Sequence, residues 1–387
     1  MKICHLCLNG PYNEGWNYQE NILPKYHVKN GNQVYQLVTP YMWEGTKLIT
    51  SPLERYVNQA GVEVIRCRAK KGFIGGTRLN RYPEVKQLLE EINPDVLFIH
   101  DIQCLDIMVV VKYLKKNPKC LTYADNHSDF SNSATNWFSK NILHKILWRK
   151  MAHLINPYVK KFYGVLPARV DFLVDLYRLP REKCELLVMG SDDELAEEAG
   201  RPHSKKNIRE VYNIAENDFL IMTGGKIDLF KTQTLLLMKA VSNIKNKNVK
   251  LIVFGSIAPE LQTQVNELTN ENVRYIGWVN AADSYSLFAA SDLVVFPGRH
   301  SVFWEQVAGQ GIPMLVKYWE GTTHVDCGGN VEFLHEDSEK EIQKKIEEII
   351  FTDKYTEMKK AAEISKKQFL YSEIAKKSIE ITIEERV

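Results

Sequence analysis

The sequence predicts an α/β protein of two doubly wound domains, each with a parallel sheet covered by helices on both faces. Short apolar runs rich in β-branched residues alternate with helical patterns, which is the order that βαβ units produce. This alternation stops at a polar segment near the middle of the chain and then begins again. A chain of 387 residues is also long for one core and comfortable for two domains of ordinary size.

The first half contains six runs that we interpret as strands, namely KICHLCL, QVYQLVT, VEVIRCR, DVLFIHD, CLTYAD and CELLVMG. The second half contains five more, namely DFLIMTGG, VKLIVFG, VRYIGWV, LVVFPG and PMLVKYW. Helical patterns such as TQTLLLMKAV separate them. In open parallel sheets, ligands bind beyond the carboxyl ends of the strands, so we expect a site in a cleft between two facing sheets.

The polar segment 191–207 contains Gly-Arg-Pro and has no strand pattern. We therefore place the domain boundary there, with a first domain at 1–192 and a second domain at 193–365. The remaining residues, 366–387, are charged and have a helical pattern.

Composition excludes several classes of protein. Fifty basic and 48 acidic residues leave a net charge of +2, which is too balanced for a general nucleic-acid binder. The seven cysteines lack the spacing of a secreted disulfide framework, so we expect reduced thiols. The chain begins with neither a signal-peptide pattern nor a membrane span. We expect a cytoplasmic protein without a nucleic-acid partner.

A glycine-rich turn with two lysines follows the first strand of the second domain. In the segment 222–241 the strand ends at Gly224 and Gly225, the loop carries Lys226 and Lys231, and a helix begins directly afterwards. Glycines let backbone approach a phosphate, a helix N-terminus offers N–H groups, and lysines supply positive charge. This combination indicates an anion site, although lysine-bearing loops are also common as solvated surface.

Glu305 stands in the first turn of a predicted helix after the strand LVVFPG, among small and apolar neighbours. A carboxylate at a helix N-terminus gains about 0.3–1 kcal/mol in any protein, so its position alone requires no function. A carboxylate at the carboxyl end of a strand is also suited to accept hydrogen bonds from ribose hydroxyls. A diphosphate site and a ribose site together indicate a nucleotide.

At these segments the sequence resembles the family 4 glycosyltransferases, which have the GT-B fold, use sugar nucleotides and retain the anomeric configuration. The matching pieces are GGKIDLFK, VRYIGWV, EQVAGQGIP, LPREKCELLVMGSDD, CLTYADNH and FLYSEIAKKSIEI. The resemblance covers nearly the whole chain, which is similar to glycosyltransferases of bacterial polysaccharide and capsule synthesis. It implies two Rossmann-like domains, with a C-terminal helix within 366–387 that crosses back to the first domain.

The resemblance also implies roles for single residues at the nucleotide. Lys226 and Lys231, next to Gly225, would contact the diphosphate of the donor and act in catalysis. Glu305 would bind the ribose. The backbone around Trp278 and Val279 would contact the base, and a UDP-sugar is favoured over a GDP-sugar.

Two residues of the first domain have implied roles as well. His127 follows the strand of CLTYADNH and would lie near the transferred sugar as a catalytic residue. Gly15, in the loop after the first strand, would approach the sugar from the first domain.

The family commonly has two glutamates with seven residues between them, and this sequence lacks the first of the two. Gly298-Arg299-His300-Ser301 occupies that place, so the donor sugar would face His300, Ser301 or nearby backbone N–H groups, including that of Val302. Lys226 replaces a usual arginine, which keeps the charge but loses a bidentate contact.

The segment after the strand PMLV offers His324 and Asp326. They could belong to the sugar pocket or to a capped loop in which the histidine is structural. They could also suggest a metal site, but no third ligand is evident, and the resemblance implies that lysines and a helix dipole do the work of a cation. We expect no metal and no cofactor besides the nucleotide-sugar substrate.

The segment 136–161 indicates a possible surface for membranes. Between Phe130 and Val170 there are seven basic residues, no acidic ones, and interleaved aromatic and aliphatic residues. A helix with this pattern can lie on anionic lipid. A buried helix with a solvated basic face explains the pattern too. Membrane contact would place the protein at the inner face of the cell membrane, with a polyprenyl-linked glycan as acceptor.

The sequence thus predicts a retaining glycosyltransferase that moves a hexose-type sugar from a nucleoside diphosphate to a glycan acceptor. Two alternatives remain open. One is a non-hydrolysing sugar-nucleotide epimerase, which would need an acid and a base flanking the sugar. The other is a catalytically silent partner subunit that binds a nucleotide sugar.

Overall fold

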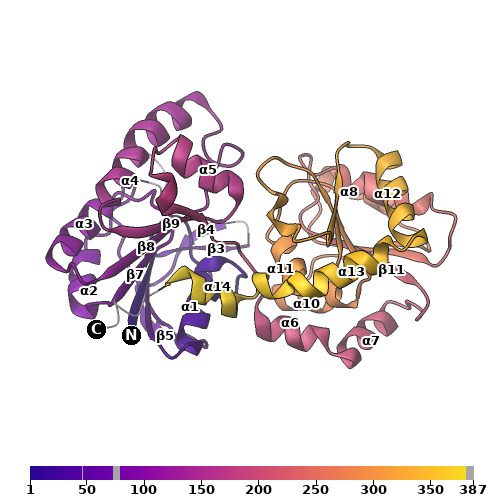
Figure 1. Cartoon of the computed structure of the whole chain (residues 1–387), viewed down its shortest axis with the longest axis horizontal. Helices are drawn as coiled ribbons and strands as arrows, with labels where there is room; N and C mark the ends of the chain where they lie inside the picture. Colours follow the sequence, from indigo (N-terminus) through magenta and orange to yellow (C-terminus); the bar gives the residue numbers. More distant parts are fainter. Residues whose placement is uncertain (46, 73–78, 381–387) are drawn as a thin grey trace. The chain divides into compact units, whose positions relative to one another are not determined.

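A computed structural model describes residues 1–45, 47–72 and 79–380, and in it the chain divides into two units between Val188 and Met189. The first unit comprises Met1–Val188 together with the segment from Ile374 onward, and the second unit comprises Met189–Glu373. Figure 1 shows the chain in sequence colours. Among the described residues, no helix is both long enough and apolar enough to cross a bilayer.

The sheet of the first unit has the strand order β10-β9-β8-β7-β1-β2-β6-β5 within the described part of the chain. All neighbours pair in parallel except β5, which runs antiparallel to β6. The strands are β1 (Lys2–Cys7), β2 (Gln33–Val38), β5 (Arg55–Val57), β6 (Glu63–Arg66), β7 (Val96–Ile99), β8 (Leu121–Asn126), β9 (Val159–Gly164) and β10 (Cys184–Leu186), and a separate hairpin consists of β3 (Tyr41–Glu44) and β4 (Lys47–Thr50).

The helices of the first unit connect these strands. They are α1 (Gln19–Lys29), α2 (Val85–Ile92), α3 (Ile107–Lys116), the π-helix η1 (Ser139–Trp148), α4 (Arg149–Ile155), α5 (Pro167–Asp175) and the 3₁₀ turn η2 (Arg181–Lys183).

Side chains of β1 alternate between the two faces of this sheet, as the strand period of two requires. Cys4 and Leu6 belong to the core that α2, α3 and α4 cover. His5 points to the opposite face, where it contacts His27 of α1. This face of the sheet therefore buries polar side chains, His5 and His27 among them.

The C-terminal helix α14 (Tyr371–Ser378) packs within the first unit from Ile374 onward. Its backbone accepts hydrogen bonds from two tyrosines of the sheet, because Tyr163 Oη donates to Lys377 O at 3.2 Å and Tyr123 Oη donates to Glu380 O at 2.7 Å. Ile374 and Ala375 are buried. The end of the described chain thus completes one face of the first sheet.

The second unit has the strand order β13-β12-β11-β14-β15-β16, and all its neighbouring strands are parallel. The strands are β11 (Phe219–Gly224), β12 (Val249–Phe254), β13 (Val273–Tyr275), β14 (Leu293–Phe296), β15 (Met314–Lys317) and β16 (Val331–Leu334). The helices and 3₁₀ turns are α6 (Asp193–Gly200), α7 (Pro202–Val211), α8 (Gln233–Ser242), η3 (Pro259–Leu261), α9 (Gln262–Leu268), α10 (Ala281–Ala290), α11 (Phe303–Gly309), η4 (Thr323–Val325), α12 (Glu339–Phe351), α13 (Lys354–Ser365) and η5 (Lys366–Phe369).

The polar segment 191–207 forms part of α6 and α7 of the second unit. Asp192 caps α6, because its carboxylate accepts a hydrogen bond from the N–H of Glu194 at 3.1 Å. Ser191 N donates to Phe369 O at 2.7 Å within the same unit. The chain therefore divides four residues before the predicted boundary, and η5 also stays with the second unit.

Candidate functional site

A pocket in the second unit lies at the carboxyl ends of β11 and β14. It is lined by Thr223, Gly224, Gly225, Lys226, Ile227, Lys231, Thr234, Val253, Phe254, Phe296, Pro297, Gly298, Arg299 and Ser301. The sequence predicted Gly225, both lysines and Ser301 as site residues. The pocket brings all four together.

Two glycines set the backbone at this pocket, because Gly225 lines it and Gly255 packs against Gly225. Gly225 has φ of +132°, which a residue with a side chain rarely adopts. A Cβ at Gly255, after the neighbouring strand β12, would lie 1.8 Å from the carbonyl oxygen of Gly225. Only glycine at both places lets the two loops meet, and the N–H of Ile227 then donates to Ser256 O at 2.8 Å.

Three cationic side chains, Lys226, Lys231 and Arg299, gather at the pocket with little negative charge to balance them. Asp228 forms an ion pair with Lys226 at 3.4 Å, but Lys226 remains 65% exposed. Burial lowers the pKa of Lys231; the positive charges of Lys226 and Arg299 lower it too, against the effect of Asp228. Like charges held together in a hollow are relieved when an anion binds, so the pocket suits a phosphate or diphosphate.

Glu305 lies beside this pocket in the first turn of α11 and is fully buried. Two imidazoles contact the same carboxylate oxygen, because His300 Nε2 and His324 Nε2 each lie 2.8 Å from Glu305 Oε1. His300 stands between two residues that line the pocket, Arg299 and Ser301. We call His300, Glu305 and His324 the second-unit cluster.

The two histidines keep Glu305 ionised. Burial by itself would raise its pKa, but the nearby charge of His300 and the hydrogen bonds from both rings hold the pKa of Glu305 well below its ordinary value. The other oxygen, Glu305 Oε2, has no hydrogen-bond partner among the described residues, although it is buried. A buried carboxylate oxygen without a donor is costly, which makes it a ready acceptor for a hydroxyl group of a ligand.

The remaining predicted residues of the second unit lie near strand ends. Trp278 and Val279 follow β13, and Trp278 is 72% exposed, so its indole face is accessible. Val302 is the residue before α11 and is half-buried. None of these three lines the pocket with the cationic residues.

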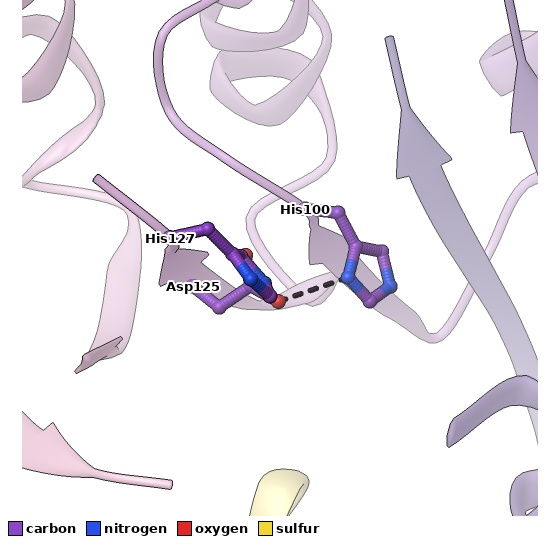
Figure 2. Close-up of side chains that lie close together, drawn as sticks. All are labelled: His100, Asp125 and His127. Carbon is purple, nitrogen blue, oxygen red and sulfur yellow. Dashed lines mark hydrogen bonds and ion pairs between the residues drawn. The ribbon is translucent and has the colours of Figure 1, made fainter. Parts of the chain in front are cut away.

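His127 follows β8 in the first unit, as predicted, and belongs to a group of polar residues at the carboxyl edge of that sheet. Figure 2 shows His100, Asp125 and His127 together. His100 Nδ1 lies 2.9 Å from Asp125 Oδ2, and His127 Nε2 lies 3.4 Å from Asp125 Oδ1. We call these three residues the first-unit cluster.

Carboxyl groups surround the partly exposed His127. Burial opposes charge on His127, but Asp125, Asp101 and Glu20 raise its pKa. Asp101 holds the backbone of this residue, because His127 N donates to Asp101 Oδ1 at 3.2 Å. The His127 side chain is 26% exposed and can therefore meet a ligand.

Gly15, the other predicted residue of the first unit, lies in the loop between β1 and α1. It is exposed, has φ of +77° and has open space around the position of a Cβ. Its role at the transferred sugar stays a prediction.

The segment that offered His324 and Asp326 separates into two roles. His324 contacts Glu305, whereas Asp326 Oδ1 accepts a hydrogen bond from Gly329 N at 2.9 Å and so closes a turn. Both clusters contain the side-chain types that bind divalent metals. In each cluster, imidazole N–H groups that donate to a carboxylate account for the geometry without a metal ion.

Sequence reasoning did not assign Arg299 to the anion site or His324 to Glu305. Arg299 belongs to the segment 298–301 that the sequence had already singled out, three residues after the end of β14, so its charge was the available signal. His324 is separated from Glu305 by 19 residues and a strand, and the sequence gives no local sign of that contact.

The comparisons with known proteins concern the fold and the second unit. Residues 218–350 match the model of a family described as Glycosyl transferases group 1. No curated protein matches the chain by sequence. A solved glycosyltransferase from Rickettsia africae ESF-5 is similar over 100% of this chain and 98% of its own, with 14% identity and a TM-score of 0.68.

Two further solved structures are similar. HepE from Anabaena in complex with UDP aligns over 97% of this chain and 98% of its own, with 18% identity and a TM-score of 0.68. The UDP-GlcNAc 2-epimerase from Neisseria meningitidis bound to UDP-GlcNAc aligns over 97% and 98%, with 13% identity and a TM-score of 0.62. These likenesses show the fold, which is the α/β architecture with Rossmann-like units of GT-B glycosyltransferases.

Proposed function

We propose that the chain is a glycosyltransferase that moves a sugar from a nucleoside diphosphate to a glycan or lipid-linked glycan, with retention of anomeric configuration. The observation that carries this proposal is the convergence of Lys226, Lys231 and Arg299 on a glycine turn. That turn lies within the segment that matches the group 1 glycosyltransferases. Synthesis of a bacterial surface polysaccharide is the process in which such a transfer would serve.

The donor would bind along the carboxyl edge of the second sheet. Its diphosphate meets the cationic pocket, its ribose donates a hydroxyl to Glu305 Oε2, and its base lies against the exposed face of Trp278. The solved complexes of HepE with UDP and with UDP-glucose support UDP as the nucleotide. His300 and Ser301 follow Arg299 in the chain, and the transferred sugar, which is joined to the diphosphate at the end away from the ribose, would face this segment.

The chemistry would rest on stabilising the leaving group. As the bond between the anomeric carbon and the phosphate oxygen breaks, negative charge develops on the diphosphate, and the three cations stabilise it. Each charge-assisted contact contributes about 1.5–3 kcal/mol. The acceptor hydroxyl attacks from the same face and its proton passes to the departing phosphate oxygen, which retains the configuration.

A panel of nucleotide sugars tests the proposal. With an acceptor mixture, or through slow hydrolysis without one, the protein should release the free nucleoside diphosphate. Conversion of one nucleotide sugar into another would support the epimerase, for which the likeness to UDP-GlcNAc 2-epimerase is the motivating observation. Binding of a donor without any turnover would support the silent subunit instead.

The anion site can be tested with two lysines of one segment. Lys231→Ala should weaken UDP binding roughly 10- to 150-fold, the equivalent of one charge-assisted contact. Lys239→Ala, on the exposed side of α8, is the matched control and should bind UDP as the native protein does. Calorimetry at two salt concentrations measures the UDP affinity of both variants. Equal affinities would contradict the assignment of the diphosphate to this pocket.

We also propose that the first unit contacts anionic membrane through 136–161. Trp137, at 71%, and Phe138 and Ile146 are exposed around the π-helix η1, and exposed basic residues such as Lys145 and Lys150 alternate with them. Trp148 is buried, so only part of the apolar pattern belongs to the core. Sedimentation with anionic and neutral vesicles tests this: Trp137→Ala should reduce binding to anionic vesicles, and equal binding to both vesicle types would contradict it.

A further inference from the structure

A line of hydrogen-bonded imidazoles crosses the interior of the first unit and begins at the first-unit cluster. His100 joins Asp125 through Nδ1, as Figure 2 shows, and its other nitrogen, Nε2, lies 2.9 Å from His5 Nδ1. His5 stands on β1, one strand further along the sheet, and is fully buried. His100 is 6% exposed.

The line continues to the C-terminal helix. His5 Nε2 lies 2.9 Å from His27 Nδ1 on α1. His27 Nε2 then lies 3.0 Å from Ser378 Oγ and 3.2 Å from Ala375 O, both on α14. We call His5, His27 and His100 the histidine chain; each ring uses both of its nitrogens.

Counting protons along the histidine chain shows what charge it carries. The carboxylate of Asp125 and the carbonyl of Ala375 can only accept hydrogen bonds, so both ends of the chain require an N–H. Four hydrogen bonds then need four protons, whereas three neutral imidazoles supply three. One ring therefore carries an extra proton whenever His27 Nε2 is a donor.

The hydroxyl of Ser378 allows a second arrangement. In the structure this hydroxyl donates to Ala375 O at 2.9 Å, which leaves its oxygen to accept from His27. If it turns and donates to His27 Nε2, three neutral rings satisfy the line, at the cost of a lone pair facing Ala375 O. The two bonds between rings and the bond to Ser378 then reverse, whereas His100 Nδ1 still donates to Asp125. The two arrangements differ by one proton and by the direction of these three hydrogen bonds.

We propose that the histidine chain holds one extra proton beside Asp125 and can conduct it to Ser378. On release, His100 passes its Nε2 proton to His5 Nδ1, His5 passes its Nε2 proton to His27 Nδ1, and His27 passes its Nε2 proton to Ser378. The proton reaches Ser378 Oγ, and the serine proton leaves to hydroxide, which becomes water. Only N–H and O–H bonds change, so the step is balanced.

The surroundings indicate which ring carries the charge in the structure. The titratable groups that act on the histidine chain are Cys7 of β1, Asp125 of β8 and Glu20 of α1. Asp101 and His127 act on Asp125. Burial opposes charge on all three rings.

At His100 the effects of Cys7 and Asp125 outweigh burial and raise the pKa well above its ordinary value. Burial lowers the pKa of His5 and lowers that of His27 to about 4. His100 is therefore the charged ring, paired with Asp125.

This assigns the histidine chain a positioning role. A charged His100 keeps Asp125 ionised, and Asp125 holds His127 through its other oxygen. The protonation of the histidine chain depends only on residues of the first unit, whereas any effect of it on sugar transfer rests on the proposed function. An experiment can therefore contradict one of these without contradicting the other.

Nitrogen NMR of protein labelled at histidine tests the proton count directly. At neutral pH, His100 should be protonated at both nitrogens, and His5 and His27 should be neutral with the proton on Nε2. As the pH rises, all three should change together, and the protons of His5 and His27 should move to Nδ1. A neutral His100 at neutral pH, or three independent titrations, would overturn the proposal.

Three variants separate proton conduction from packing. Ser378→Ala removes the donor that the neutral arrangement needs, so the coupled transition should move to higher pH; an unchanged or lower midpoint would count against conduction. His27→Gln keeps an N–H for Ala375 O but cannot pass a proton, so His5 should no longer respond when His100 titrates. His27→Phe should lose that response and also loosen α14, measured by hydrogen exchange of Ile374 and Ala375.

His203→Gln, at an exposed histidine of the second unit, is the control for the loss of one imidazole and should leave the transition unchanged. The wild-type spectra decide the proton count even if His27→Phe fails to fold. If the spectra agree but no nucleotide sugar is turned over, the histidine chain stands and the proposed function fails.

Discussion

The two units each contain a carboxylate between two histidines, and the two arrangements differ in what the carboxylate has left to offer. In the first-unit cluster both oxygens of Asp125 are used, since Oδ2 meets His100 and Oδ1 accepts from Asp101 N at 2.8 Å. In the second-unit cluster both imidazoles contact Oε1 of Glu305, and Oε2 has no partner.

Asp125 therefore has partners on both oxygens within its own unit, whereas Glu305 keeps one oxygen to which a ligand could donate. Asp125 is part of a saturated network that ties β7 and β8 to α14 through the histidine chain. Glu305 is held and kept ionised by its two histidines while one oxygen remains free beside a cationic pocket. We therefore expect the first-unit cluster to serve stability and the second-unit cluster to serve recognition.

The largest expected effect is on stability, in the first unit. Asp125→Asn removes one partner of a buried ion pair, which costs about 3–5 kcal/mol in the free energy of unfolding. Chemical denaturation measures it. Asp171→Asn, an exposed carboxylate paired with Arg181, is the control and should change the free energy by less than about 1 kcal/mol. A small loss at Asp125 would mean that the first-unit cluster is not a tight ion pair.

The second effect is on recognition. Glu305→Gln removes the charge that accepts the ribose hydroxyl, so UDP affinity should fall by about 1.5–3 kcal/mol, or roughly 10- to 150-fold. Folded Asp125→Asn should bind UDP like the native protein. Calorimetry measures both affinities. Reduced UDP affinity in Asp125→Asn together with unchanged affinity in Glu305→Gln would reverse the roles assigned to the two clusters.

The third effect distinguishes the clusters by pH. The pKa of His100 is raised in the folded state, so its stabilisation is complete below the ordinary histidine pKa of about 6.5 and is lost as the pH rises through the raised value. The pKa of Glu305 is lowered, so its stabilisation is present above the ordinary glutamate pKa and is lost only on acidification.

Stability should therefore fall on the alkaline side by about 1.4 kcal/mol per pH unit for the one proton of the histidine chain. Denaturation between pH 7 and 10 measures this slope. His100→Gln should flatten it, whereas His324→Gln should leave it unchanged. An alkaline slope that persists in His100→Gln would have to come from another group.

The smallest effect concerns one of the two donors to Glu305. His324→Phe removes a hydrogen bond to a charged acceptor and should weaken UDP binding by about 1–2 kcal/mol. His324→Gln keeps a donor and should recover most of that affinity. Equal losses in the two variants would show that ring packing, and not the hydrogen bond, positions Glu305.

Local patterns were enough to predict the elements that carry the site. The apolar runs gave the parallel strands of both units, and glycines before a helix gave the pocket at Gly225, Lys226 and Lys231. His127 was predicted beside a strand end and lies there. The segment 191–207 was assigned to the boundary but belongs to helices of the second unit, because helix capping and packing within that unit are decided by distant contacts such as Ser191 with Phe369.

The sequence by itself determined which residues stand at strand ends, since strand periodicity and turn residues are local properties of the chain. Only the tertiary structure decided which strand ends are neighbours. The order of strands in each sheet brings Arg299 to the lysines, His324 to Glu305, and His100 to a histidine 95 residues away. Crossover connections set that order, and no local pattern records how they run.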